Sequence, residues 1–173
     1  YDNEAYMNTG IQRSGSTPYG AATTTTPVGK KIHGKLRHKK NMPEIMRAHE
    51  IPYMATASIS YPNDFLRKVE KARDTKGFRS LHVFAPCPTG WRHDPAKTIE
   101  MGRKAVESGM WTLYEAEYGD VTNIYKPKKK IPVKDYIRDQ GRFRHFTEEM
   151  LNELQRFADR KWKLTYGPFP EDE

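Results

Sequence analysis

The densest group of oxygen-donating residues lies at the start of the chain, in residues 2–12, DNEAYMNTGIQ. This segment reads as a loop that directly follows the end of a strand. Mg²⁺ takes near-octahedral oxygen coordination and usually binds through one or two protein groups, with phosphates and water completing the shell. A side-chain amide and a nearby backbone carbonyl would suit such an ion. The same residue types also form ordinary turns and caps, so by themselves they favour a structured loop.

The second chemically reactive position is the single cysteine, Cys87, which stands between two prolines in the segment APCPTGW, residues 85–91. It comes immediately after a predicted strand, and the prolines would hold a thiolate rigidly. A lone cysteine is also commonly a small buried hydrophobe, so a structural role stays open. One thiol excludes an internal disulfide framework and fits a reducing compartment.

A basic run, Lys30–Lys40, places six Lys or Arg residues and two His around Gly34. Such runs are usually solvated surface, although a functional version would attract an anionic partner and raise encounter rates. The six histidines show no metal-binding spacing such as HExxH, and the sequence has no P-loop, dinucleotide fingerprint or nucleophile turn. Hydrolase, NTPase and dehydrogenase functions therefore have no positive signal.

The composition is typical of one globular domain, with 173 residues, 36% hydrophobic, and a formal charge of +8. The charge makes an acidic protein, a phosphorylated cofactor or nucleic acid a plausible partner. No apolar run approaches the roughly 20 residues that cross a bilayer, and no signal-peptide pattern begins the chain, which predicts a cytoplasmic protein. Because the sequence opens at Tyr1 without Met, we expect a fragment or a processed product.

Residues 1–40 show no helical or strand period, which predicts a long functional loop region. Regular elements are expected from Asn41 onward. The first is a helix that begins near Pro43 and stops at Ile51-Pro52, and a strand Tyr53–Ile59 follows it. The second helix is expected to be capped by Asn63, with Phe65, Leu66, Val69 and Ala72 on one face, and a strand Ser80–Ala85 follows it. Gly77 is expected to close the second helix.

The rest of the chain continues the alternation. We expect a helix from Asp94-Pro95 to Gly109, followed by a strand pair, Trp111–Ala116 and Val121–Tyr125, and a basic loop, Lys126–Lys130. A last helix is expected to be capped by Thr147, and its apolar stripe consists of Met150, Leu151, Leu154, Phe157 and Ala158. Residues Gly167–Glu173 are expected to form a tail. The order of alternating helices and strands predicts a parallel sheet covered by helices, with binding groups at the carboxyl ends of its strands.

Residues 2–12 resemble the second half of the thiamine-diphosphate and magnesium motif of pyruvate:ferredoxin oxidoreductases and other 2-oxoacid:ferredoxin oxidoreductases. Agreement through Gly10 and Gln12, followed by the Ser-, Thr- and Pro-rich stretch Ser14–Pro27, favours this resemblance over a simple turn. The resemblance runs to Trp91 and weakens after about Gly109. The family's Gly-Asp-Gly half-motif lies about one βα unit upstream and is absent here, which implies the C-terminal part of a β subunit.

The implied fold is α/β, the C-terminal portion of a parallel-sheet thiamine-diphosphate-binding domain, with helices on both faces and a C-terminal helix. We expect residues 1–173 to form a single domain. Its parts would be the cofactor loop and basic loop (1–40), an α/β core (41–118), and a peripheral strand, basic loop and C-terminal helix (119–173).

The resemblance also implies roles for five residues. The Asn3 side chain and the Ala5 backbone carbonyl would bind Mg²⁺, while the family's aspartate ligand would lie in the absent part. Asn8 and Thr9 match the Asn-Thr-Gly near the thiazolium and substrate, with Asn8 as a hydrogen-bonding catalytic residue. Cys87 would be one ligand of a 4Fe-4S cluster, which needs about four thiolates, so the other three would come from outside this chain.

The implied activity is oxidative decarboxylation of a 2-oxoacid, with pyruvate as the first choice over branched-chain or aryl acids. Coenzyme A would accept the acyl group and ferredoxin the electrons, within a multi-subunit complex. The run Lys30–Lys40 could then bind coenzyme A phosphates or the acidic face of ferredoxin.

Two alternatives belong to other classes: a basic nucleic-acid-binding module, or a noncatalytic assembly subunit of the same fold. Against the former, aromatic residues such as Phe65 and Phe157 take core-like positions, and no RNP-type signature occurs. We therefore expect neither nucleic acid nor a membrane as a partner.

Overall fold

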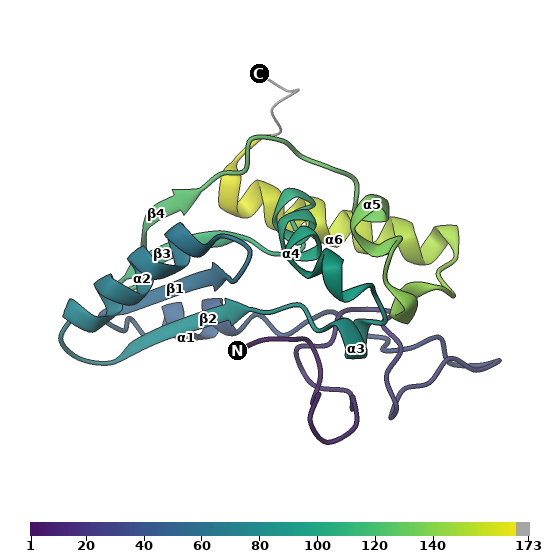
Figure 1. Ribbon diagram of the computed structural model, residues 1–173. Coiled ribbons are helices and arrows are strands. Elements are labelled where there is room, and N and C mark those ends of the chain that lie inside the picture. Colours follow the sequence, from purple (N-terminus) through teal and green to yellow (C-terminus); the bar gives the residue numbers. More distant parts are fainter. Residues whose placement is uncertain (169–173) are drawn as a thin grey trace.

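A four-stranded sheet organises the computed structural model, which describes residues 1–168 (Figure 1). Its order is β2-β1-β3-β4. The strands are β1 (Tyr53–Ser58), β2 (Arg79–Phe84), β3 (Leu113–Glu117) and β4 (Asp120–Tyr125). The predicted parallel pairing is confirmed for β1 and β2, whereas β3 pairs antiparallel with both β1 and β4. The sheet is therefore mixed, because the predicted strand pair joins the free edge of β1.

The turn between β3 and β4 explains the antiparallel pair. Tyr118 and Gly119 both have positive φ, 48° and 89°, which is the geometry of a two-residue hairpin turn that follows the twist of its strands. All six residues of β4 are exposed, in agreement with its predicted peripheral place.

Six α-helices and two short 3-10 turns surround this sheet among residues 1–168. They are α1 (Met42–Ala48), α2 (Pro62–Asp74), α3 (Pro88–Trp91), η1 (Pro95–Lys97), α4 (Thr98–Glu107), α5 (Val133–Ile137), η2 (Gly141–Phe143) and α6 (Glu148–Tyr166). Thr147 caps α6 as predicted, because its side-chain oxygen accepts a hydrogen bond from the Met150 N–H at 3.3 Å. Of the predicted tail, only Gly167 and Pro168 fall within the described residues.

The buried side of α2 differs from the predicted apolar face. Leu66 and Val69 are 59% and 38% exposed, whereas Lys68 is 1% exposed. The Lys68 ammonium donates to the Thr56 carbonyl at 2.9 Å and contacts Asp64 at 2.5 Å, so a paired charge occupies the inner face. Asn63 also lies inside the first turn of α2 and does not cap it, since the helix begins at Pro62.

Helices cover both faces of the sheet, as predicted. Tyr53 and Ala55 pack with Ala72 of α2 on one face, whereas Met54 packs with Tyr114 under α1 on the other. The largest core lies beyond the carboxyl ends of β1 and β2, where α4, α5 and α6 gather (Figure 1). The indole rings of Trp91 and Trp111 are part of this core.

Glu115 on β3 has 0% exposure and gives the fold a pH dependence. Burial by itself would raise the pKa of Glu115, but hydrogen bonds from Arg67, Tyr53 and Asn123 outweigh it and lower the pKa to about 2. A carboxyl whose pKa is lowered by folding stabilises the protein above its unfolded pKa, and that contribution is lost as the pH falls toward the folded value.

We therefore expect Glu115→Gln to flatten the loss of stability between about pH 5 and pH 2, as measured by urea unfolding at a series of pH values. Glu70→Gln, at an exposed position on α2, is the matched control and should retain the wild-type slope. Equal slopes for all three proteins would contradict this role of Glu115.

Candidate functional site

The predicted cofactor loop begins as a short extension of the sheet. The Asp2 N–H donates to the Val83 carbonyl at 2.7 Å, and the Ala85 N–H donates to the Asp2 carbonyl at 3.0 Å, so Asp2 runs parallel to the end of β2. Cys87 follows that same strand end by three residues. The loop and the cysteine therefore start from one edge of the sheet, at the carboxyl end where the sequence predicted binding groups.

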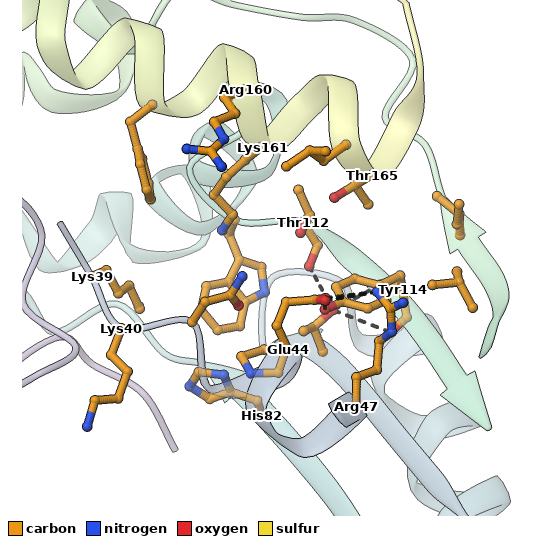
Figure 2. Close-up of a pocket in the computed structure, with 18 residues that line it drawn as sticks. Lys39, Lys40, Glu44, Arg47, His82, Thr112, Tyr114, Arg160, Lys161 and Thr165 are labelled. Atoms are coloured by element: carbon orange, nitrogen blue, oxygen red, sulfur yellow. Dashed lines mark hydrogen bonds and ion pairs between the residues drawn. The ribbon is translucent and has the colours of Figure 1, made fainter. Parts of the chain in front are cut away.

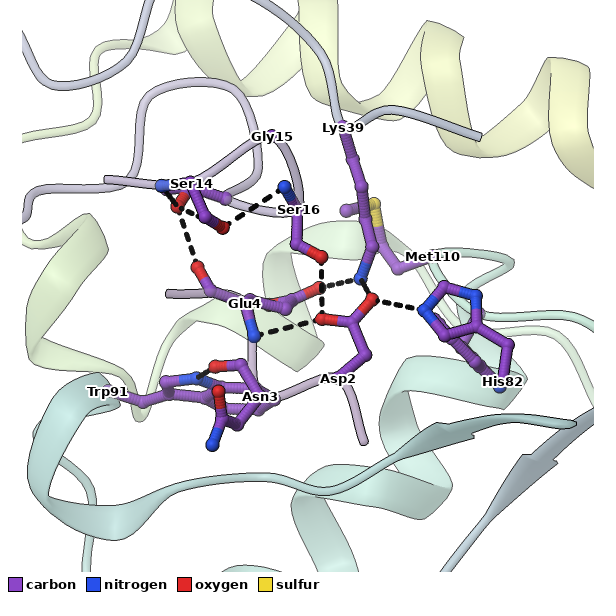
Figure 3. Close-up of polar contacts among 12 residues, drawn as sticks. Asp2, Asn3, Glu4, Ser14, Gly15, Ser16, Lys39, His82, Trp91 and Met110 are labelled. Atoms are coloured by element: carbon purple, nitrogen blue, oxygen red, sulfur yellow. Dashed lines mark hydrogen bonds and ion pairs between the residues drawn. The ribbon is translucent and has the colours of Figure 1, made fainter. Parts of the chain in front are cut away.

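The Asp2 carboxylate is fully engaged (Figure 3). One oxygen accepts hydrogen bonds from the Glu4 N–H at 3.0 Å and the Ser16 hydroxyl at 2.8 Å. The other contacts Lys39 Nζ at 2.7 Å and His82 Nε2 at 2.8 Å. Burial would raise the pKa of Asp2, but the His82 hydrogen bond and the Lys39 charge hold it well below its usual range. Asp2 is therefore a buried anion that fixes the start of the loop.

Glu4 is the second buried anion of this loop and has a left-handed backbone, with φ at 69°. One carboxylate oxygen contacts Lys39 Nζ at 3.1 Å, and the other contacts Arg142 at 2.6 Å. The Glu4 carbonyl accepts a hydrogen bond from the Thr17 hydroxyl at 2.7 Å. The guanidinium of Arg142 lies over the Trp91 ring, 3.9 Å from its centroid.

We call Asp2, Glu4, Lys39, His82 and Arg142 the buried charge cluster. Its anions flank Asn3 on both sides, so the cluster holds the backbone of the predicted metal-binding residues. The sequence shows Asp2 and Glu4 beside Asn3, but it gives no signal that the partners are Lys39 and Arg142.

The two predicted magnesium ligands are free of competing contacts. The Asn3 backbone carbonyl accepts a hydrogen bond from Trp91 Nε1 at 2.8 Å. Within residues 1–168, the Asn3 side-chain amide and the Ala5 carbonyl make no hydrogen bond, and both residues are half-buried. Figure 3 shows the Asn3 amide extending away from the buried charge cluster. The arrangement thus fits a hard cation that binds amide and carbonyl oxygens.

Asn8 and Thr9 lie at the tip of a small hairpin. Tyr6 and Gln12 exchange two backbone hydrogen bonds, at 2.9 and 3.2 Å, and close the tip. Thr9 donates from its hydroxyl to the Gln12 side chain at 3.1 Å. Both Asn8 and Thr9 are exposed, so a ligand or another chain could reach them.

Cys87 lies against this same loop. Its sulfur is half-buried and accepts a hydrogen bond from the Gly90 N–H at 3.4 Å, at the start of α3. A methyl group on Gly90 would overlap the sulfur of Met7 and lie 3.6 Å from Cys87 Sγ. Since Trp91 also binds the Asn3 carbonyl, α3 brings the cysteine and the predicted cofactor loop together. No group of three His, Cys, Asp or Glu residues suited to a metal occurs within residues 1–168.

The basic run Lys30–Lys40 is only partly solvated. Lys35 is 7% exposed, and its ammonium donates to the carbonyls of Gly15 at 3.0 Å and Thr17 at 2.5 Å. Burial lowers the pKa of Lys35 to about 8. Together with Lys39, it packs residues of the basic run against the cofactor loop, whereas Lys30, Lys31, Arg37 and Lys40 are exposed.

Comparison with known proteins shows what the chain resembles. The family model described as "Thiamine pyrophosphate enzyme, C-terminal TPP binding domain" matches residues 1–83. This range includes the predicted cofactor loop, the buried parallel strands and α2. The class that this part of the chain matches is therefore a thiamine-pyrophosphate-binding domain of the C-terminal type.

Two relatives are similar over nearly the whole chain. The pyruvate synthase subunit PorB of Methanothermobacter marburgensis is 60% identical over 92% of this chain and 55% of its own length. The ketoisovalerate oxidoreductase subunit VorB of Pyrococcus abyssi is 51% identical over 94% of this chain and 53% of its own length. The chain is thus homologous to the PorB and VorB subunits over nearly its whole length, in agreement with its resemblance, and spans about half the length of these relatives.

A solved structure shows a more distant likeness. It is the 2-oxoglutarate:ferredoxin oxidoreductase from Magnetococcus marinus with 2-oxoglutarate, coenzyme A and succinyl-CoA bound. The match covers 88% of this chain and 55% of that chain, with 17% identity and a TM-score of 0.46. That likeness is too distant to transfer the role of any residue.

No helix within residues 1–168 is long and apolar enough to cross a bilayer.

Proposed function

We propose that this chain forms part of the thiamine diphosphate site of a multi-subunit enzyme that oxidatively decarboxylates a 2-oxoacid to an acyl-CoA and CO₂, with ferredoxin as the electron acceptor. The main support is the geometry of the predicted cofactor loop of this chain. The anions Asp2 and Glu4 are held in ion pairs, while Asn3 and Ala5 keep oxygens without hydrogen-bond partners within residues 1–168. Pyruvate is the proposed substrate, because relatives named pyruvate synthase reach 60% identity.

The proposed Mg²⁺ would be held by the Asn3 side chain and the Ala5 carbonyl, with a third protein ligand and the cofactor's phosphates from outside this chain. Mg²⁺ prefers octahedral oxygen coordination, so two oxygens from this chain leave positions for the third protein ligand and for the phosphates. Thiamine diphosphate, when bound, supplies the electron sink for decarboxylation. The exposed amide of Asn8 would donate a hydrogen bond near the reacting centre, and Thr9 would position it by binding Gln12.

Cys87 would hold one iron of a 4Fe-4S cluster whose other three thiolates lie outside this chain. The fit rests on its half-buried sulfur, on the Gly90 N–H that points at it, and on the contact between α3 and the loop. Hydrogen bonds to cluster sulfurs are among the means by which proteins set the potential of such a cluster. Coenzyme A and ferredoxin would then be partners, and the exposed part of Lys30–Lys40 offers positive charge to either.

The two alternative classes have less support. A nucleic-acid module would use exposed aromatics for base stacking. All three tryptophans are at most 3% exposed, and the exposed aromatics are Tyr and Phe side chains such as Tyr6, Phe78 and Tyr118. A noncatalytic assembly subunit would not need free oxygens at Asn3 and Ala5. The experiment on Asn3 below separates this last alternative from the proposed enzyme.

Asn3→Ala in the complete complex is expected to weaken Mg²⁺-dependent thiamine diphosphate binding about 10- to 100-fold, because one metal ligand is lost. The dissociation constant would be measured by titrating the cofactor at fixed Mg²⁺. Asn152→Ala, at an exposed position on α6, is the matched control and should bind like the wild type. If Asn3→Ala also bound the cofactor like the wild type, the proposed metal role would be wrong.

A further inference from the structure

A separate cavity lies on the α1 side of the sheet. It has a volume of about 420 Å³ and is enclosed by α1, α6 and the facing residues of β1, β2 and β3. This volume is in the range of small-molecule sites. None of residues 2–12 lines the cavity, and only Lys39 and His82 belong both to its wall and to the buried charge cluster. The cavity is therefore distinct from the predicted cofactor loop.

The cavity wall contains more positive charge than its carboxylates neutralise. Arg47 is paired with Glu44 at 2.9 Å, and Lys39 is paired within the buried charge cluster. Within residues 1–168, three further cations of the wall have no carboxylate partner: Lys40, Arg160 and Lys161. Figure 2 shows Arg160 and Lys161 extending from α6 toward the space above α1.

Lys161 is the innermost of these three cations. Its ammonium donates to the Met110 carbonyl at 3.3 Å. Burial, followed by the nearby Lys39 charge, lowers the pKa of Lys161 to about 8. A positive group that is desolvated and lacks a counterion gains from an anion placed beside it. Arg160 adds a planar donor pair of the kind that binds phosphate oxygens with two hydrogen bonds.

The opposite part of the cavity wall is apolar. Val121 and Ile124 of β4 and Leu164 of α6 line it, and they are 42%, 43% and 77% exposed. Exposed aliphatic residues beside an uncompensated positive group match a ligand that has both an anionic end and an apolar end. A simple inorganic ion would leave this apolar wall in contact with water.

We propose that this cavity binds an organic phosphate at a site separate from the thiamine diphosphate loop. Arg160 and Lys161 bind the phosphate, and the apolar portion of the ligand packs against Val121, Ile124 and Leu164. Phosphate is favoured over carboxylate because a dianion compensates the charges of both Arg160 and Lys161. The inference does not depend on the proposed function, since it uses no residue of the cofactor loop.

Phenyl phosphate is the probe, titrated by calorimetry into the complete complex with thiamine diphosphate already bound. Saturable binding is expected, and Arg160→Gln should weaken it about tenfold, the usual effect of one charge-assisted hydrogen bond. The double variant R160Q/K161Q should weaken it about 100-fold by the same estimate. Arg156→Gln, one turn earlier on α6, removes a cation outside the cavity and should leave the affinity unchanged.

Leu164→Ser tests the apolar wall at an exposed position that does not endanger folding. It should weaken phenyl phosphate binding but leave inorganic phosphate binding unchanged. The proposal is overturned if the wild-type complex does not bind phenyl phosphate, or if Arg160→Gln and Arg156→Gln bind it equally. It is also overturned if phenyl phosphate displaces thiamine diphosphate, which would locate it in the cofactor loop.

Discussion

Replacing Arg142 by methionine is expected to lower the free energy of unfolding by about 3–5 kcal/mol, the usual cost of removing one partner of a buried ion pair. The side chains of Arg142 and Glu4 are each 3% exposed, and their charged atoms are 2.6 Å apart. The methionine would leave one Glu4 oxygen buried without its cation. Urea unfolding followed by tryptophan fluorescence would measure the loss, because Arg142 lies over the Trp91 ring.

Arg138→Met provides the matched control for this experiment. Its side chain is 64% exposed and lies 3.9 Å from Asp139, so we expect a loss of at most about 1 kcal/mol. The double variant E4Q/R142M should recover part of the stability, since it removes both charges together. Similar losses for Arg138→Met and Arg142→Met would contradict the structural importance of the buried charge cluster.

Cys87→Ser in the complete complex is expected to reduce iron content and to slow ferredoxin reduction at least about tenfold, because a proposed cluster ligand becomes a poorer one. Iron analysis, the visible spectrum and the rate of ferredoxin reduction would measure the effect. The thermal stability of the complex should change little, since serine fills nearly the same space.

A structural cysteine would give a different result. If Cys87 only packs beside Met7 and Gly90, then serine would alter stability and leave both iron content and ferredoxin reduction unchanged. That outcome would refute the assignment. Met7→Leu, which alters packing at the same contact without changing any sulfur ligand of the proposed cluster, should retain the wild-type iron content.

Local sequence signals predicted the elements that depend on neighbouring residues. Pro43 lies in the first turn of α1 and Thr147 caps α6, because each effect acts within one turn of chain. The predicted end of α2 at Gly77 was wrong, because the helix ends at Asp74 and Thr75 is its C-cap. The short helices α3 and α5 were not predicted. Each has at most five residues, which is too short for a helical period to appear in the sequence.

Local sequence patterns could not predict features that depend on residues far apart in the chain. The antiparallel attachment of β3 to β1 joins Met54 to Ala116, a pairing that no short motif specifies. For the candidate site, the loop residues Asn3 and Ala5 could be chosen by resemblance, but their supports could not. Arg142 pairs with Glu4 across 138 positions of sequence, so only the folded chain reveals the contact.

The single turn α3 has a mechanical consequence. Cys87 begins this turn, and Trp91 ends it with a hydrogen bond to the backbone of Asn3. The spacing of these two residues within one rigid turn therefore sets the separation between the sulfur and the predicted metal-binding oxygens. An insertion or deletion inside residues 87–91 would therefore change the separation between the Cys87 sulfur and the Asn3 backbone.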